Sequence, residues 1–491
     1  MNERLRAILV TPDSPIREVM QAIGRGSMEI ALVVDANGRL LGTVSDGDIR
    51  RAILDGAELS DAVAPFMAKS PKVVTPSVDR GAVLELMRRH LLAQIPVVDE
   101  SGVLIDLHIM QELIVPLSVP RLGENAHRYV RECLDTNFVS SVGPFVDRFE
   151  REFAAFVGVD DAVACASGTA ALHVALLMAG AGPGSLVAVS DLTFIASANA
   201  IAYTGADILV VDSEPRTWNL DGQLLYEEVE RRAKAGERVP AVIEVVHLLG
   251  HPADMEPIIA LRDRFGITIV EDASEALGAT YVGGVFAGRQ VGSIGDIGCF
   301  SFNGNKILTT GGGGMIVSND RAVADRARHL TTQAKLPGRG YVHDEIGFNY
   351  RLTNIAAALG VAQLEHLDAA LAAKRGIASR YGEALAGLRC SPPPSEPWAE
   401  STYWLYTILL DENAPSRDTV LDELNASAVQ ARPIFPPIHL QPPYSKVERI
   451  GGDIAEDIHE RGISLPSSVD LTSIDQEWVI QQVAAALAPV R

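Results

Sequence analysis

Cysteine and basic charge are both scarce in this sequence. Cysteine occupies four of 491 positions, and no two cysteines have the spacing of a CxxC pair, so neither a disulfide framework nor a zinc site is indicated. Lysine and arginine together number 42 against 63 aspartates and glutamates, which gives a net charge of −21. This charge argues against a general role in binding nucleic acid or acidic membranes. It is compatible with an anionic small substrate, because a few placed basic residues suffice locally.

Uninterrupted hydrophobic segments of membrane-spanning length are also missing. Residues 162–190 contain no charged side chain and are long enough to cross a bilayer, but Gly180, Gly182, Pro183 and Gly184 divide them into a helix and a strand. We therefore predict a buried core segment there. The first residues lack the apolar stretch of a secretory signal. These features lead us to expect a cytoplasmic protein without membrane partners.

A metal site is not expected either. His247 and His251 have the i,i+4 spacing of a helical ligand pair, but Gly250 and Pro252 disrupt any helix between them. Roles in packing or in a loop are therefore favoured for both histidines.

One lysine, Lys306, lies between an aromatic-flanked serine and a run of glycines. Residues 299–306 read CFSFNGNK, and four glycines follow at 311–314. By itself this segment is typical of a surface lysine beside a flexible loop. It is not a Walker P-loop, because Asn305 stands where that motif needs glycine.

Two other segments supply what a pyridoxal phosphate enzyme needs besides a lysine. Residues 267–271 predict a buried strand that ends in Asp272, and residues 168–169 (Gly-Thr) open an apolar helix over 170–179. The cofactor requires an amine that forms a Schiff base, a carboxylate that keeps the ring nitrogen protonated, and helix-terminal N–H groups that hold the phosphate. Lys306, Asp272 and the helix start match these three needs.

Several segments in this order resemble the DegT/StrS-type nucleotide-sugar aminotransferases, which are fold-type I pyridoxal phosphate enzymes. The resemblance runs from about Leu122 to the C-terminus. It is carried by FVSSVG at 138–143, EDA at 271–273, SFNGNK at 301–306 and NYR at 349–351. It implies an α/β fold with a large domain, built on a mostly parallel sheet, and a small C-terminal α/β domain. Short β-rich runs alternate with helical patterns after residue 162, which independently favours such a sheet, with ligands at the carboxyl ends of its strands.

The resemblance also implies roles for individual residues. Lys306 would be the Schiff-base lysine that moves the proton between substrate and cofactor, and Asp272 the partner of the ring nitrogen. Phe194 matches the aromatic residue that stacks on the ring, although a core role for it stays open. Glu275 stands where many members carry glutamine, which puts a hydrogen bond to the phenolic oxygen in doubt. The phosphate would be held by Gly168, Thr169 and Ser301, and by Asn349 from the other subunit of a homodimer.

Residues 1–115 contain an internal repeat with an offset of 64. The segment VVD at 33–35 recurs at 97–99, which indicates two copies of one supersecondary unit. In the first copy we predict a hairpin over 30–44 and a helix over 46–54. The repeat resembles a tandem CBS pair, a module that in other proteins often binds adenine nucleotides. We place the domains at 1–115 for this pair, 116–365 for the large domain and 366–491 for the small domain.

By the CBS resemblance, Ser45 and Asp48 of the first copy would hold the ribose of a nucleotide. The second copy has Ile109 and Glu112 at the equivalent positions, so its site is in doubt. Two roles stay open for the pair: an adenine nucleotide site, or dimer packing without a ligand.

The predicted function is transamination of a nucleotide sugar. Glutamate would donate its amino group to C4 of a UDP- or GDP-linked 4-keto-6-deoxy (N-acetyl)hexosamine, for surface polysaccharide or nonulosonic acid synthesis. Residues 342–347 (VHDEIG) and 271–275 (EDASE) most resemble the legionaminate and bacillosamine branch. One alternative is GDP-perosamine synthase, which differs in the acceptor. Another is a nucleotide-sensing regulator with a degenerate aminotransferase scaffold, against which the intact Lys306 and Asp272 argue.

Overall fold

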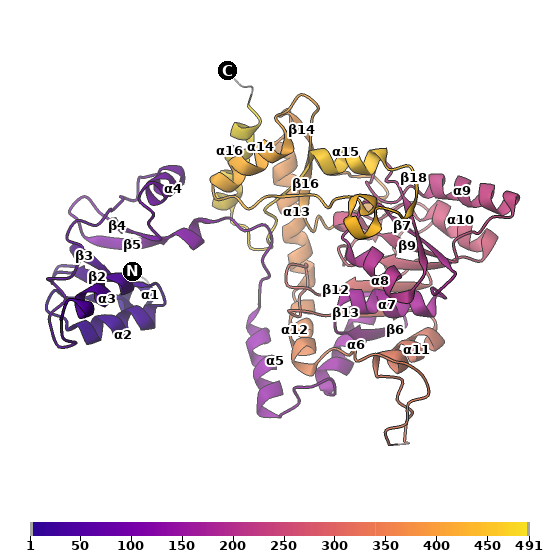
Figure 1. Ribbon diagram of the computed structural model, residues 1–491, viewed down its shortest axis with the longest axis horizontal. Coiled ribbons are helices and arrows are strands. Elements are labelled where there is room, and N and C mark those ends of the chain that lie inside the picture. The colour runs from indigo at the N-terminus through magenta and orange to yellow at the C-terminus, as the bar shows by residue number, and fades with distance from the viewer. Residues whose placement is uncertain (1–2, 339, 489–491) are drawn as a thin grey trace. The chain divides into compact units, whose positions relative to one another are not determined.

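The computed structural model describes residues 3–338 and 340–488. They divide into two compact units (Figure 1). The first unit contains residues 1–115 with 426–429, and the second contains 116–425 with 430–491. Within the described residues no single helix is long and apolar enough to span a membrane. One pair, α12 (Asn354–Leu364) with α13 (Leu367–Ala384), passes that test by length and composition together, with a bend of 61° between its members.

Two similar hairpins form the core of the first unit. β2 (Ile30–Val34) pairs antiparallel with β3 (Leu40–Ser45), and β4 (Gln94–Val98) pairs in the same way with β5 (Leu104–Ile109). Each hairpin has a register shift at the same place in the repeat, after Val33 in the first copy and after Val97 in the second. The structure therefore confirms the internal repeat. The unit also contains α1 (Glu3–Ala7), β1 (Leu9–Val10), α2 (Ile16–Gly26), α3 (Asp46–Leu54), α4 (Arg80–Arg89) and η1 (Met110–Leu113).

An eight-stranded sheet forms the centre of the second unit. Its strand order is β18-β8-β7-β9-β10-β12-β13-β6, and all neighbours are parallel except the two pairs that involve β13. The expected mostly parallel α/β sheet is confirmed. The strands are β6 (Asp161–Cys165), β7 (Leu186–Ser190), β8 (Asp207–Val211), β9 (Val242–Val246), β10 (Thr268–Asp272), β12 (Ile297–Ser301), β13 (Gly314–Ser318) and β18 (Glu448–Ile450).

Helices cover both faces of this sheet, as Figure 1 shows. Because side chains alternate along a strand, neighbouring residues of one strand enter different cores. Ile243 of β9 packs into one core and Val242 into the other. The first core includes residues of α5 (Glu124–Asp135), α6 (Pro144–Val157), α9 (Gly222–Ala235), α10 (Glu256–Phe265) and α12; the second includes residues of α7 (Gly168–Met178), α8 (Ala196–Thr204) and α11 (Arg321–Thr331).

The C-terminal part contributes to two sheets. A four-stranded sheet has the order β14-β16-β19-β17. The strand β18 does not belong to this sheet and pairs with β8 at the edge of the large sheet. The elements of this part are β14 (Cys390–Ser391), β16 (Tyr406–Leu410), α14 (Arg417–Ala426), β17 (Arg432–Pro433), η3 (Ile438–Leu440), η4 (Pro442–Tyr444), α15 (Asp453–Arg461), β19 (Gly462–Leu465) and α16 (Ser473–Ala486). A short ladder joins β11 (Thr280–Tyr281) to β15 (Ala399–Glu400), and η2 covers Leu248–Gly250.

Candidate active site

A cavity of about 280 Å³ lies at the carboxyl ends of the central strands. Seven of the eight cofactor-contacting residues expected from the sequence line it: Gly168, Thr169, Phe194, Asp272, Glu275, Ser301 and Lys306. The eighth, Asn349, is exposed and forms a β-bridge with Thr332. Asn349 does not line this cavity within the single chain, and its expected role in another subunit stays a prediction.

The register of three neighbouring strands brings the lysine loop next to the start of α7. Gly314 of β13 pairs with Ser301 of β12 on one side and with Cys165 of β6 on the other. Only a glycine fits at position 314, because a Cβ there would lie 2.4 Å from the carbonyl oxygen of Ser167. A Cβ on Gly168 would likewise lie 2.6 Å from the Cβ of Ser301.

The N-terminus of α7 offers N–H groups to an anion. Ser167 caps the helix, since its Oγ accepts from the N–H of Ala170 at 3.0 Å and its carbonyl oxygen accepts from Ala171 at 3.1 Å. Among the described residues, the N–H groups of Gly168 and Thr169 have no such acceptor. Free N–H groups at a helix N-terminus suit a phosphate, so this part of the cavity fits the phosphate group of the cofactor.

Asp272 lies at the end of β10 and is 4 % exposed. Its Oδ2 accepts a hydrogen bond from the Ser197 hydroxyl at 2.9 Å, and its Oδ1 accepts one from the N–H of Ser274 at 3.1 Å. Ser197 Oγ in turn lies 3.1 Å from Thr193 Oγ1. These contacts fix the orientation of a buried carboxylate that opens into the cavity, which fits the expected partner of a pyridine nitrogen.

Lys306 and Glu275 face each other across the inner wall of the cavity. The Lys306 side chain is 13 % exposed, and its Nζ lies 3.8 Å from Glu275 Oε1. Burial lowers the pKa of Lys306, while the carboxylates of Glu275 and Asp272 oppose that effect. Burial raises the pKa of Glu275, and the charge of Lys306 works against the rise. Each group therefore makes the charged form of the other less costly.

Two further buried glutamates near Asp272 have contrasting surroundings. Glu271 accepts hydrogen bonds from the N–H groups of Gly292, Ile294 and Gly295 and lies 2.9 Å from His247 Nε2, so its pKa is lowered in spite of its burial. Glu244 has no hydrogen-bond partner among the described residues for either oxygen. Burial and the charge of Asp272 raise the pKa of Glu244 well above the ordinary value.

The wall of the cavity contains the expected Phe194 and three residues that sequence reasoning missed. Phe194 is 53 % exposed, which excludes a core role, and its ring centroid lies 5.6 Å from that of Phe435. Phe435, Ser197 and Trp404 also line the cavity and were not expected there. Ser197 has a local signal, since it lies in the first turn of α8, three residues after Phe194. Phe435 and Trp404 come from the C-terminal part, and nothing in their local sequence indicates the contact.

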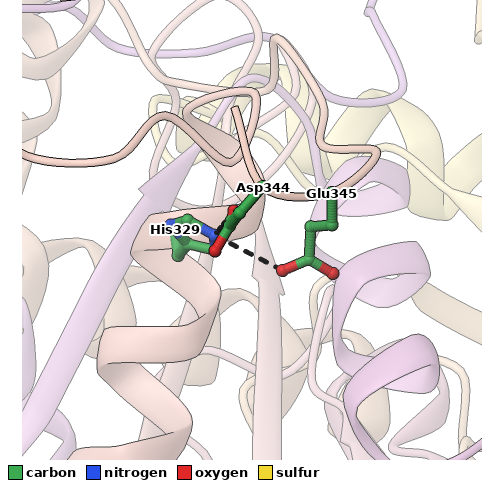
Figure 2. A group of neighbouring side chains, drawn as sticks. All are labelled: His329, Asp344 and Glu345. Carbon is green, nitrogen blue, oxygen red and sulfur yellow. Dashed lines mark hydrogen bonds and ion pairs between the residues drawn. The ribbon is translucent and has the colours of Figure 1, made fainter. Parts of the chain in front are cut away.

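A separate group of titratable side chains lies away from this cavity. Figure 2 shows His329 of α11 beside Asp344 and Glu345, with its Nε2 at 2.7 Å from Asp344 Oδ1 and 3.3 Å from Glu345 Oε1. Arg326 also pairs with the Glu345 carboxylate and lowers its pKa. We interpret the group as an ion-pair network, because the arginine already compensates the acidic charge.

The two CBS residues named from the sequence form a helix cap. Ser45 Oγ accepts from the N–H of Asp48, and Asp48 Oδ2 accepts from the N–H of Ser45 at 2.8 Å, which is a capping box at the start of α3. Arg51 pairs with the other carboxylate oxygen. Burial raises the pKa of Asp48, but the Ser45 hydrogen bonds and the charge of Arg51 outweigh it, and the pKa is lowered.

Comparison with known proteins identifies the larger unit. Residues 120–484 match the model of the DegT/DnrJ/EryC1/StrS aminotransferase family. The chain belongs to this family. Its members are sugar aminotransferases that depend on pyridoxal 5′-phosphate, and the cavity fits that cofactor in its lysine, its carboxylate and its helix terminus. The enzyme class and the cofactor expected from the sequence are thereby confirmed. Residues 3–55 and 61–106 match the CBS domain, which confirms the tandem pair.

Individual relatives cover the aminotransferase part almost completely. A GDP-perosamine synthase from Caulobacter vibrioides is 43 % identical over 379 residues, which are 77 % of this chain and 98 % of the relative. One from Escherichia coli O157:H7 is 40 % identical over 369 residues, 75 % of this chain and 97 % of the relative. A solved structure, the PLP form of the sugar aminotransferase Spr1654 from Streptococcus pneumoniae, is 25 % identical with a TM-score of 0.69, and covers 76 % of this chain and 98 % of that chain.

Proposed function

We propose that this aminotransferase transfers the amino group of glutamate to C4 of a GDP-linked 4-keto-6-deoxyhexose, as a GDP-perosamine synthase. The main support is the 43 % and 40 % identity to two GDP-perosamine synthases over nearly their full length. This similarity supports the acceptor of GDP-perosamine synthase, the alternative from the sequence, better than the N-acetylhexosamine of the legionaminate and bacillosamine branch. The product would be a 4-amino-4,6-dideoxy sugar for surface polysaccharide synthesis.

The geometry of the cavity supports a role for each residue. When bound, the cofactor supplies an electron sink that acidifies the carbon bearing the amino group. Asp272, oriented by Ser197, would keep the ring nitrogen protonated. Gly168, Thr169 and Ser301 would hold the phosphate. Lys306 would remove the proton from Cα of glutamate and, in the second half of the reaction, deliver one to C4 of the sugar.

The acceptor can be tested directly. The purified protein, loaded with cofactor, is incubated with glutamate and either a GDP-linked 4-keto-6-deoxyhexose or a UDP-linked 4-keto-6-deoxy-N-acetylhexosamine, and the products are identified by NMR. We expect amination at C4 of the GDP-linked sugar only. Amination of the UDP-linked sugar alone would overturn the proposed acceptor and favour the other branch. A protein that cannot be loaded with cofactor, and so stays colourless, and that turns over neither sugar would instead support the regulator with a degenerate scaffold.

We further propose that the CBS pair binds one adenine nucleotide per chain, through Asp48 and Ser45 of the first repeat. The second repeat has no equivalent polar pair. Titration calorimetry with ATP, ADP and AMP should show binding that Asp48→Ala abolishes. Asp79→Ala is the matched control, because Asp79 caps α4 of the same module by accepting from the N–H of Ala82 at 3.0 Å. Absence of heat with all three nucleotides would favour dimer packing without a ligand. Equal loss in both variants would refute a specific role for Asp48 in nucleotide binding.

A further inference from the structure

Trp404 forms a wall of the cavity directly at the lysine amine. Its ring centroid lies 3.7 Å from Lys306 Nζ, and the residue is only 3 % exposed. Glu275 Oε1 lies 3.8 Å from the same nitrogen. The amine therefore has an aromatic face and a carboxylate as its two partners, and both favour its charged form.

Three hydrogen bonds fix the position of Trp404. Its indole N–H donates to the carbonyl oxygen of Asn305 at 2.8 Å, which ties the ring to the residue directly before Lys306. Its backbone N–H donates to Leu249 at 3.0 Å, and its carbonyl oxygen accepts from Lys374 Nζ at 2.7 Å. Rotation of the ring away from the amine would break the indole hydrogen bond, and the two other bonds hold the backbone of Trp404 in place.

Two non-glycine residues next to Trp404 and Glu275 have left-handed backbone conformations. Leu249 has a φ of 54° and Tyr403, next to Trp404, has a φ of 48°. Leu249 connects the two partners of the lysine: its N–H donates to Glu275 Oε2 at 2.8 Å, and its carbonyl oxygen accepts from Trp404. Such conformations are costly for residues with a side chain and concentrate at functional sites.

We propose that Trp404 and Glu275 form a resting site that holds the Lys306 amine as an ammonium whenever it is not joined to the cofactor, which makes Trp404 a catalytic residue. The assignment rests on the proposed function of Lys306. A lysine that moves protons must exist in both a charged and a neutral form. Burial alone would favour the neutral form. The ring face and the carboxylate oppose this effect by stabilising the charged form, and they attract the neutral amine much less, so loss of the proton frees Lys306 to react.

The contribution of the ring face can be measured without changing its shape. The protein is produced with tryptophan replaced by mono- to tetrafluorinated tryptophan, which weakens the negative face of the ring. In cofactor-free protein, the pH profile of Lys306 acetylation, read by peptide mass spectrometry, gives the pKa of the amine. We expect this pKa to fall stepwise with fluorine content, by about 0.4 to 1.5 in total, as the loss of a desolvated cation–π contact implies.

A matched pair of variants assigns the effect to one residue. Trp404→Phe keeps an aromatic ring at this position, but the ring is no longer a tryptophan and so carries no fluorine. Fluorination should therefore no longer change the pKa of Lys306 in this variant. Trp398→Leu removes a tryptophan that stacks on Tyr281 instead, and the fluorination effect should persist. An unchanged pKa in fully fluorinated wild type, or an effect that persists in Trp404→Phe, would overturn the inference.

Borohydride reduction of cofactor-loaded protein separates this inference from the proposed function. Trapping of the cofactor on another lysine would refute the role of Lys306 itself, whatever the fluorination result. Trapping on Lys306 together with an unresponsive pKa would leave the aminotransferase site intact and refute only the role of Trp404.

Discussion

Lys374 of α13 is a buried amine whose titration should be visible in the stability of the protein. It is 2 % exposed, and its Nζ donates to the carbonyl oxygens of Trp404 and Ser467. No carboxylate among the described residues forms an ion pair with it. Burial lowers its pKa from 10.5 to about 7. Replacing it with methionine, which has a similar length and no charge, removes this titration.

The sign and size of the effect follow from linkage. Between pH 7 and pH 10.5 the unfolded chain holds a proton on this lysine and the folded chain does not, so the wild type gains stability as the pH rises. Each pH unit in this window corresponds to about 1.4 kcal/mol. Relative to Lys374→Met, the free energy of unfolding of the wild type should rise by about 2 kcal/mol between pH 7 and pH 9, and stay constant below about pH 6. The two carbonyl groups left without a donor add a cost that does not depend on pH.

Urea unfolding followed by tryptophan fluorescence measures this difference. All four tryptophans lie in the second unit, so the signal reports on the unit that contains Lys374. Cofactor-free protein is used because a bound ligand would add its own pH dependence. Lys234→Met is the control, since it removes an exposed lysine that pairs with Glu230 on α9. A flat difference for Lys374→Met would show that the folded protein keeps this amine charged, and would refute the reasoning.

Three other predictions concern the cofactor site. Asp272→Asn should retain the cofactor but lose on the order of a hundredfold in kcat; kcat within about threefold of wild type would contradict its role at the ring nitrogen. Gly314→Ala should weaken cofactor affinity by about tenfold, because its Cβ would displace the backbone of residue 167. The spectroscopic titration that shows this should find Gly182→Ala, where a Cβ meets nothing within 4 Å, unchanged. In the homodimer that the family resemblance implies, mixing inactive Lys306→Ala with inactive Asn349→Ala should restore part of the activity, and failure of this rescue would argue against a shared site.

Local sequence was enough to predict the central strands and most of the cavity. Buried parallel strands appear as short apolar runs, and the ligand-binding residues follow directly at their carboxyl ends. The strand expected at 267–271 is β10, one residue displaced, and Asp272 is its last residue. The cavity residues predicted from the sequence lie in short segments, and each segment can be recognised from a few consecutive residues. Their assembly into one site needed only that the strands be parallel.

Contacts that depend on distant segments were not predictable in the same way. β18 has only three residues, two of them exposed, and becomes a strand because its backbone pairs with β8. Trp404 reads as an ordinary core residue until the hydrogen bond to Asn305 places its ring on Lys306. Such contacts are set by tertiary packing and leave no periodicity or spacing in the sequence.

The antiparallel strand β13 explains how a mixed sheet still gathers the site at one edge. β12 runs parallel to β10, and two successive antiparallel pairings, β12 with β13 and β13 with β6, return β6 to the same direction. The carboxyl ends of β10, β12 and β6 therefore lie at one edge, where they present Asp272, the lysine loop after Ser301, and the capped start of α7. The reversal also places the first residue of β13, Gly314, between the other two strand ends. Because Gly314 lacks a side chain, the backbone of Ser167 and Gly168 at the start of α7 can lie directly against it.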